Sequence, residues 1–315
     1  MMGSKLNFDG YMAPVFTPFD DAHKLKLEIV PGYSKYLHAS GIKGILVNGT
    51  SGEGCAQSLE ERKAVAEAWA KCRPEGQTIV VQVGGGPLPD VIALAKHAEE
   101  LGVDGIMCLH DLFFRPAGVD QLVDYLALVA AAAPRTPLFY YHLPGFTGIN
   151  VSMSALLEKC ASENKVPTFG GLKFTSSDLQ ELGKCVQVIK KFSSNNYRVF
   201  LGCDDLLLPA YTLGSISAIG TTFNIFPEAA LKLEKLLHQG DFKKAAKAQE
   251  AISKAVNFIT DNGLRPWVPS MKAAMNACAT IEMGPTRNPQ TSAFTQEQKN
   301  TMGIEVKNIL SDIFV

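Results

Sequence analysis

Amphipathic stretches alternate with short, uniformly apolar runs along most of the chain. In VPGYSKYLHASGIKGILVNGT, an amphipathic segment stops at Gly41 and an apolar run follows. The same unit recurs in VIALAKHAEELGVDGIMCLH, where Gly102 takes the place of Gly41. Glycine directly after a helix accepts the left-handed conformation without steric cost. Runs that are apolar throughout are typical of parallel strands buried on both faces. The pattern predicts repeated helix–strand units around a parallel sheet.

These apolar runs predict eight strands, at residues 13–16, 45–47, 79–83, 106–109, 138–141, 171–173, 199–201 and 218–219. Helices are predicted between them, at residues 59–71, 90–101, 118–132, 152–159, 178–190 and 205–213. Eight βα units favour an α/β fold of the (β/α)8 TIM barrel type over an open doubly wound sheet. A dinucleotide-binding fold is further disfavoured because no G-x-G-x-x-G follows the first strand.

The pattern changes after residue 224, where only helices are predicted, at residues 227–238, 242–260, 270–280 and 295–313. We therefore predict a barrel domain over residues 1–225 that carries the active site. Residues 226–315 are predicted to form a C-terminal helical extension packed on the barrel.

Composition narrows the class of protein. The net charge of −1 comes without a basic run, which disfavours nucleic acid or an anionic membrane as partner. The seven cysteines are odd in number and form no C-x-x-C pair, which indicates reduced cytosolic thiols and no zinc site. No apolar run approaches the ~18 residues of a membrane span. A soluble cytoplasmic protein is expected.

Active sites of such barrels lie at the carboxyl ends of the strands, so polar residues that end apolar runs are the candidates for chemistry. These are Thr17, the NGTSGE turn at residues 48–53, Tyr141, Lys173, GCDD at residues 202–205 and GTTFN at residues 220–224.

Lys173 ends the apolar run in GGLKFTSSD. Burial at the barrel rim disfavours the charged ammonium form, and a neutral amine can attack a carbonyl carbon to form a Schiff base. The alternative is a structural ion pair with Asp204 or Asp205. The position of Lys173 alone does not decide between a Schiff-base lysine and a structural ion pair.

Tyr141 ends the neighbouring strand and is the candidate proton carrier for this chemistry. A phenol can carry protons to and from a carbinolamine and its leaving hydroxyl. The alternative is an aromatic core residue, but strand alternation directs Tyr140 to the opposite face and makes it the better candidate for that role.

Thr50 and Ser51 lie between glycines in the GTSGE turn. Such a turn exposes backbone N–H groups and hydroxyls, which suit a small carboxylate. The motif alone has low specificity because similar turns are common on protein surfaces.

Together, GTSGE, the Tyr-x-x-Pro of YHLPGFTG, GLKFTSSD and GCDD…GTTFN resemble the class I aldolase-type lyases related to N-acetylneuraminate lyase and dihydrodipicolinate synthase. The resemblance covers effectively the whole chain. It implies a (β/α)8 barrel with C-terminal helices, usually a homotetramer, that works through a lysine–pyruvate Schiff base without a metal or an organic cofactor.

By the same resemblance, Lys173 is the Schiff-base lysine and Tyr141 the proton carrier. Thr50 positions the tyrosine and contacts the carboxylate, and Ser51 is a second carboxylate ligand. The lyase branch carries a polar set that binds a polyhydroxylated chain, matched here by Thr175, Gly202, Asp204, Asp205, Gly220 and Thr221.

Three positions depart from the family pattern or separate its branches. Phe146 stands where the synthase branch carries a carboxylate-binding arginine, which favours a sugar-acid substrate. Asp205 replaces a glutamate common in the lyase branch, and Phe114 replaces a tyrosine often supplied by a neighbouring subunit.

The expected reaction is cleavage of sialic acid to pyruvate and N-acetylmannosamine. Two alternatives stay open. One is a pyruvate-dependent aldolase acting on a 2-keto-3-deoxy sugar acid or 4-hydroxy-2-oxoglutarate, and the other is a barrel that binds a keto acid without turnover.

Overall fold

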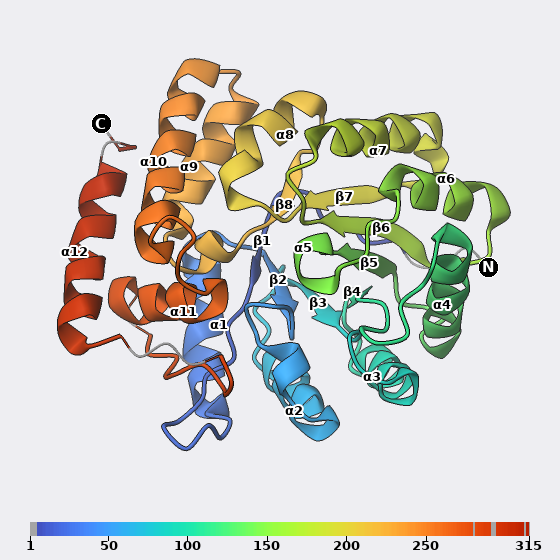
Figure 1. Ribbon diagram of the computed structural model, residues 1–315, viewed down its shortest axis with the longest axis horizontal. Coiled ribbons are helices and arrows are strands. Elements are labelled where there is room, and N and C mark those ends of the chain that lie inside the picture. Colours follow the sequence, from blue (N-terminus) through green and yellow to red (C-terminus); the bar gives the residue numbers. More distant parts are fainter. Residues whose placement is uncertain (1–4, 280, 291–293, 312, 315) are drawn as a thin grey trace. The chain divides into compact units, whose positions relative to one another are not determined.

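The computed structural model describes residues 5–279, 281–290, 294–311 and 313–314 (Figure 1). Eight parallel strands are hydrogen-bonded in chain order as a closed barrel. The strands are β1 (Tyr11–Pro14), β2 (Gly44–Val47), β3 (Thr78–Gln82), β4 (Gly105–Cys108), β5 (Leu138–His142), β6 (Phe169–Phe174), β7 (Arg198–Leu201) and β8 (Ser217–Ile219). The predicted fold class is confirmed, and each predicted strand overlaps an observed one.

Contacts divide the chain into two compact units. Unit 1 comprises residues 1–10, 78–203 and 209–219, and unit 2 comprises residues 11–77, 204–208 and 220–315. Unit 1 therefore holds β3 to β8, whereas unit 2 holds β1, β2 and the C-terminal helices. The boundary that we place after residue 225 remains a prediction.

In unit 1, helices follow the strands and cover their outer face (Figure 1). They are α3 (Leu88–Glu100), α4 (Val119–Ala132), α6 (Met153–Glu163) and α7 (Leu179–Lys191), whereas the short α5 (Pro144–Thr147) lies in the loop after β5. The start of α7 follows from local chemistry, because the side chain of Asp178 accepts a hydrogen bond from the backbone N–H of Glu181.

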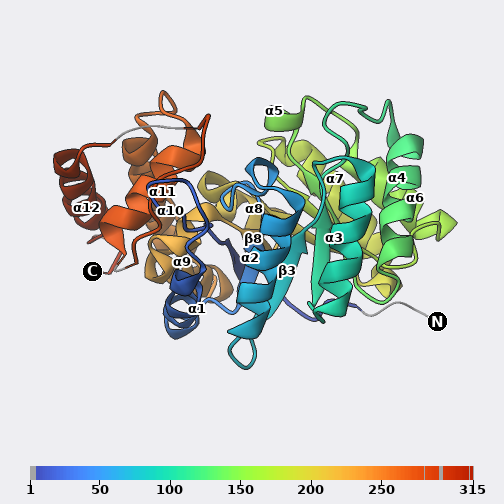
Figure 2. The same ribbon diagram turned by 90° about the horizontal axis from the view of Figure 1, so that it is seen from below.

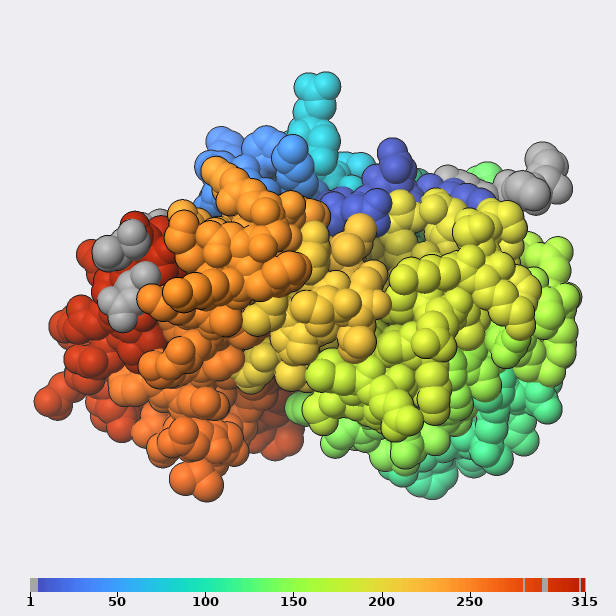
Figure 3. Space-filling model, turned by 90° about the horizontal axis from the view of Figure 1, so that it is seen from above, coloured from blue at the N-terminus to red at the C-terminus, as the bar shows by residue number. Residues whose placement is uncertain are grey.

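Unit 2 is rich in helices. They are α1 (Val30–Ala39), α2 (Leu59–Lys71), α9 (Pro227–His238), α10 (Phe242–Thr260), α11 (Trp267–Cys278) and α12 (Gln296–Ser311). Helix α10 packs against α9, α11 and α12 (Figures 1 and 2). Its apolar face is buried, and its exposed residues belong to the orange part of the surface in Figure 3. Among the described helices, none has the length and apolarity needed to cross a membrane.

Several predicted boundaries were wrong. Strand β1 begins two residues early because it pairs with β2 from Met12 onward. Helix α11 begins at Trp267, ahead of the predicted residue 270. Pro269 fits its first turn because that turn needs no intrahelical N–H bond. The predicted helix 205–213 is a 3₁₀ turn (Asp204–Leu206) followed by α8 (Leu207–Leu213). Residues 280 and 312, within two predicted helices, lie outside the described residues.

Candidate active site

Lys173 and Tyr141 face each other on adjacent strands of unit 1. They are register partners in the β5–β6 ladder, and the Lys173 amine donates a hydrogen bond of 3.1 Å to the Tyr141 hydroxyl oxygen. The amine also lies 4.4 Å from the centre of the Tyr141 ring. Lys173 is only 4% exposed and Tyr141 only 2%. A buried amine hydrogen-bonded to a phenol is an arrangement suited to Schiff-base chemistry.

A bulge in β6 sets this pairing. Leu138 pairs with Phe169 but Phe139 pairs with Gly171, so Gly170 is an extra residue in β6. Gly171 has a φ of 128°, and a Cβ there would lie 1.9 Å from the carbonyl oxygen of Arg198. Only glycine fits this position. The two glycines before the lysine thus shape the strand that presents it.

Thr175 and Gly202 lie beside the lysine. A Cβ on Gly202 would come within 2.1 Å of the Thr175 hydroxyl oxygen and 3.1 Å of the Lys173 Cε. The Thr175 hydroxyl is buried and has no hydrogen-bond partner within the described part of the chain. Unit 1 therefore groups four predicted site residues, one of which offers an unused hydroxyl.

In unit 2, the hydroxyls of Ser51 and Thr221 lie 2.9 Å apart and both residues are buried. The indole N–H of Trp267 also donates to the Thr221 hydroxyl, at 3.4 Å. Thr50 is half-buried in the same turn as Ser51, and its carbonyl oxygen accepts a hydrogen bond from the backbone N–H of Glu53. The predicted turn between β2 and α2 is therefore present, and it pairs with the turn after β8.

Asp204 stabilises the turn after β8 by hydrogen bonding. One of its carboxylate oxygens accepts hydrogen bonds from the backbone N–H and the hydroxyl of Thr222. A Cβ on Gly220 would lie 2.5 Å from that oxygen, which explains the glycine. Asp204 therefore caps the segment after β8.

Asp205 lies in the same 3₁₀ turn as Asp204. Desolvation raises the pKa of its carboxyl above the ordinary value, and a hydrogen bond with Ser253 on α10 opposes this rise. The Asp205 side chain is therefore directed to α10. Its predicted contact with a substrate hydroxyl remains a prediction.

Sequence reasoning missed a buried ion pair that involves the last residue of the GTSGE turn. Lys272 on α11 and Glu53 are 1% and 0% exposed at their side chains, and their charged atoms are 2.9 Å apart. Burial lowers the pKa of Lys272 to about 8, although Glu53 partly opposes this shift. A lysine between Met271 and Ala273, in a helix without another charged residue, was the available signal.

A second ion pair joins the segment between α11 and α12 to α2. The Arg287 guanidinium contacts both carboxylate oxygens of Glu61, at 2.6 and 2.7 Å. Glu61 also closes a capping box with Ser58 at the start of α2. The hydrogen bonds from Arg287 are the main reason that the pKa of Glu61 falls to about 2.

We expect Glu61→Gln to lower the free energy of unfolding at pH 7 by about 1 kcal/mol, since the carboxyl group is partly exposed. A depressed carboxyl pKa stabilises the fold above the unfolded value of 4.5, and this gain is lost as the pH falls toward 2. Chemical unfolding of both proteins between pH 7 and pH 3 should show the difference shrinking. Glu60→Gln, at an exposed neighbour, is the control. A difference that stays constant with pH contradicts the prediction.

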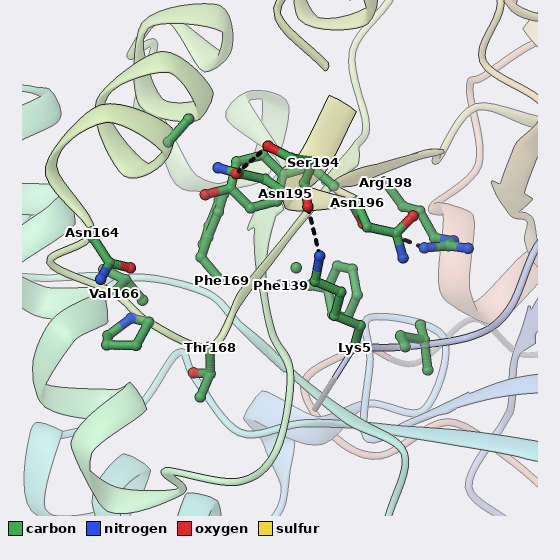
Figure 4. A pocket seen from close by; sticks show the side chains of 15 residues that line it. Lys5, Phe139, Asn164, Val166, Thr168, Phe169, Ser194, Asn195, Asn196 and Arg198 are labelled. Atoms are coloured by element: carbon green, nitrogen blue, oxygen red, sulfur yellow. Dashed lines mark hydrogen bonds between the residues drawn. The ribbon is translucent and has the colours of Figure 1, made fainter. Parts of the chain in front are cut away.

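One pocket in unit 1, with a volume of about 430 Å³, lies at the amino ends of the strands (Figure 4). Phe169 and Arg198, the first residues of β6 and β7, line it. Lys5 also lines it and donates a hydrogen bond to the carbonyl oxygen of Ser194. Since Lys173 and Tyr141 lie near the carboxyl ends of their strands, this pocket is not part of their site.

No cluster of three or more metal-binding side chains occurs among the described residues. A (β/α)8 barrel with a buried lysine against a tyrosine near the carboxyl ends of adjacent strands defines a class I aldolase type of enzyme, a carbon–carbon lyase.

Comparison with known proteins places the chain within this class. The pattern of the dihydrodipicolinate synthetase family matches residues 7–309. N-acetylneuraminate lyase of Sus scrofa is 36% identical over 307 residues, covering 95% of this chain and 93% of that protein. The Homo sapiens protein of the same name is 35% identical, with coverage of 92% and 89%. The structure of N-acetylneuraminate lyase from Aliivibrio salmonicida aligns with a TM-score of 0.87 at 31% identity, covering 96% and 97%. The chain belongs to the dihydrodipicolinate synthetase family.

Proposed function

We propose that the protein is an N-acetylneuraminate lyase, which reversibly cleaves sialic acid to pyruvate and N-acetylmannosamine. The observation that carries this proposal is the buried hydrogen bond between the Lys173 amine and the Tyr141 hydroxyl. The names of the relatives at 32–36% identity support the choice of substrate.

The reaction begins when the Lys173 amine adds to the C2 ketone of open-chain sialic acid, giving a carbinolamine after proton transfer. The Tyr141 phenol donates its proton to the C2 hydroxyl, which leaves as water. A protonated imine and a phenolate result. The protein supplies positioning and proton transfer for this step.

The phenolate then takes the proton of the C4 hydroxyl. The C3–C4 bond breaks, its electron pair flows into the imine to form an enamine, and C4 becomes the aldehyde of N-acetylmannosamine. Tyr141 returns the proton to C3, and water hydrolyses the imine to pyruvate and free Lys173. Each proton that the tyrosine gives is recovered, so one phenol serves the whole cycle.

We assign the substrate carboxylate to the turn that carries Thr50 and Ser51. The support for this assignment is the family resemblance of the GTSGE turn. The residues proposed to contact the polyhydroxylated chain are Thr175, Gly202, Asp204, Asp205, Gly220 and Thr221.

Phe146 favours this substrate over one with a second carboxylate at that position. It lies in α5 and is 68% exposed. A phenyl ring offers no hydrogen-bond donor, so it cannot bind a carboxylate as a guanidinium does.

Pyruvate release tests the proposal. We expect kcat/KM for N-acetylneuraminate to exceed that for 2-keto-3-deoxygluconate by at least about tenfold, because one missed polar contact costs roughly that much. A coupled assay for pyruvate measures both. Faster cleavage of 2-keto-3-deoxygluconate supports another aldolase of the family, and a pyruvate adduct without cleavage of either sugar acid supports a binding protein.

A homotetramer in the cytoplasm completes the proposal. Its support is the family resemblance together with Phe113 and Phe114, which are 83% and 80% exposed in the segment where a neighbouring subunit is expected. The seven cysteines are free thiols, as suits a reducing compartment.

A further inference from the structure

Lys272, the second buried lysine, uses all three N–H groups of its ammonium in hydrogen bonds. The Lys272 amine donates to the carbonyl oxygens of Thr17 and Pro285, at 2.7 and 2.8 Å, and to the Glu53 carboxylate at 2.9 Å. An ammonium group has three N–H donors, so none is left for another role. Lys272 is therefore a tether that joins α11 to two loops.

Both oxygens of the Glu53 carboxylate also accept hydrogen bonds. One Glu53 oxygen accepts from Lys272, and the other accepts from the backbone N–H of Arg287 at 2.7 Å. The Glu53 backbone has a φ of 55°, in the left-handed region that a residue with a side chain rarely adopts. A buried ion pair adds little net stability compared with apolar residues of similar volume. A positional role explains its presence better.

Glu53 ends the turn that carries Thr50 and Ser51. Its backbone N–H donates to the carbonyl oxygen of Thr50 at 3.0 Å. Within the same turn, the carbonyl oxygen of Gly52 accepts from the Thr17 hydroxyl at 2.7 Å. Since Lys272 also binds the Thr17 carbonyl, one ammonium anchors both segments that shape the turn.

We propose that Lys272 and Glu53 are positioning residues that hold the Thr50–Ser51 turn in the conformation that binds the substrate carboxylate. This inference rests on the proposed function in one respect, namely that the Thr50–Ser51 turn binds a substrate carboxylate. Its specific consequence is that loss of the ion pair weakens binding of keto acids but spares ketones that lack a carboxylate.

The test removes both charges together. Lys272→Met with Glu53→Gln replaces the ion pair by groups of similar volume, so the double variant avoids a lone buried charge. Borohydride trapping at increasing ketone concentration gives half-saturating values for pyruvate and for hydroxyacetone, a neutral ketone of similar size. We expect the pyruvate value to rise on the order of 10-fold to 100-fold, since small misplacements of binding groups cost this much. The hydroxyacetone value should stay near that of the unmodified protein.

Arg198→Met with Asp9→Asn is the matched control, because it removes an ion pair at the start of β7. It should leave both ketone values unchanged. Equal rises for pyruvate and hydroxyacetone in the Lys272–Glu53 variant, or no rise for either, overturn the proposal. If that double variant does not fold, the single variant Glu53→Gln replaces it, because its side chain keeps an acceptor oxygen for Lys272 or Arg287. The half-saturating values for pyruvate and hydroxyacetone are then compared in the same way.

Failure of the proposed function has a different signature. In that case the unmodified protein forms no pyruvate adduct, or forms one without cleaving sialic acid. The second outcome leaves the positioning test intact, because it reads adduct formation and not cleavage.

Discussion

Replacement of Lys173 by alanine is expected to abolish the borohydride-stable pyruvate adduct. It should lower kcat/KM for sialic acid on the order of 10⁴-fold or more, because covalent catalysis has no substitute nucleophile at this position. The structural basis is the burial of the amine and its hydrogen bond to Tyr141. Intact-mass analysis followed by peptide mapping measures the adduct, and a pyruvate-coupled assay measures turnover.

Two further variants make this result specific. Lys173→Met keeps most of the side-chain volume, so its loss of adduct cannot be attributed to a cavity. Lys243→Ala removes an exposed lysine on α10 and should retain both adduct and turnover. An adduct of undiminished yield in Lys173→Ala, or one that maps to another lysine, contradicts the assignment.

Replacement of Tyr141 by phenylalanine is expected to separate binding from turnover. The ring still packs at the same place in β5, but the proton carrier is gone. We expect kcat to fall by about 10²- to 10⁴-fold, the usual range for loss of general acid–base catalysis. The pyruvate adduct should still form on long incubation, because the Lys173 amine remains. Steady-state kinetics and borohydride trapping on one sample measure the two effects.

Tyr140→Phe is the control next to this site. Tyr140 is buried on the opposite face of β5, and burial raises the pKa of its hydroxyl. The variant removes the same atom one residue away and should keep kcat close to that of the unmodified enzyme. Equal losses in the two variants would show that the hydroxyl of Tyr141 has no special role.

Much of the fold was predictable because its signals are local. Gly41 and Gly102 have positive φ values of 89° and 69°, as predicted from their positions after helices. Helices 59–71, 227–238 and 242–260 have the predicted limits. Apolar periodicity and terminal caps act within a few residues, so they can be read from one stretch of chain.

The failures arise where a distant segment decides. The start of β1 depends on its ladder with β2. Lys272 and Glu53 are 219 residues apart, and nothing in the local sequence of either residue identifies the other as its partner. Their pairing follows from packing that periodicity does not encode.

The sequence by itself determined the alternation of helices and strands and the polar residues at the strand ends, Lys173 and Tyr141 among them. Tertiary structure decided which of these residues meet. If β5 and β6 paired one to one from Leu138 and Phe169, Leu172 would face Tyr141. The extra residue at Gly170 shifts the register so that Lys173 faces it. This shift depends on Gly171, whose backbone lies too close to Arg198 for any side chain, and such contacts exist only after the strands have assembled.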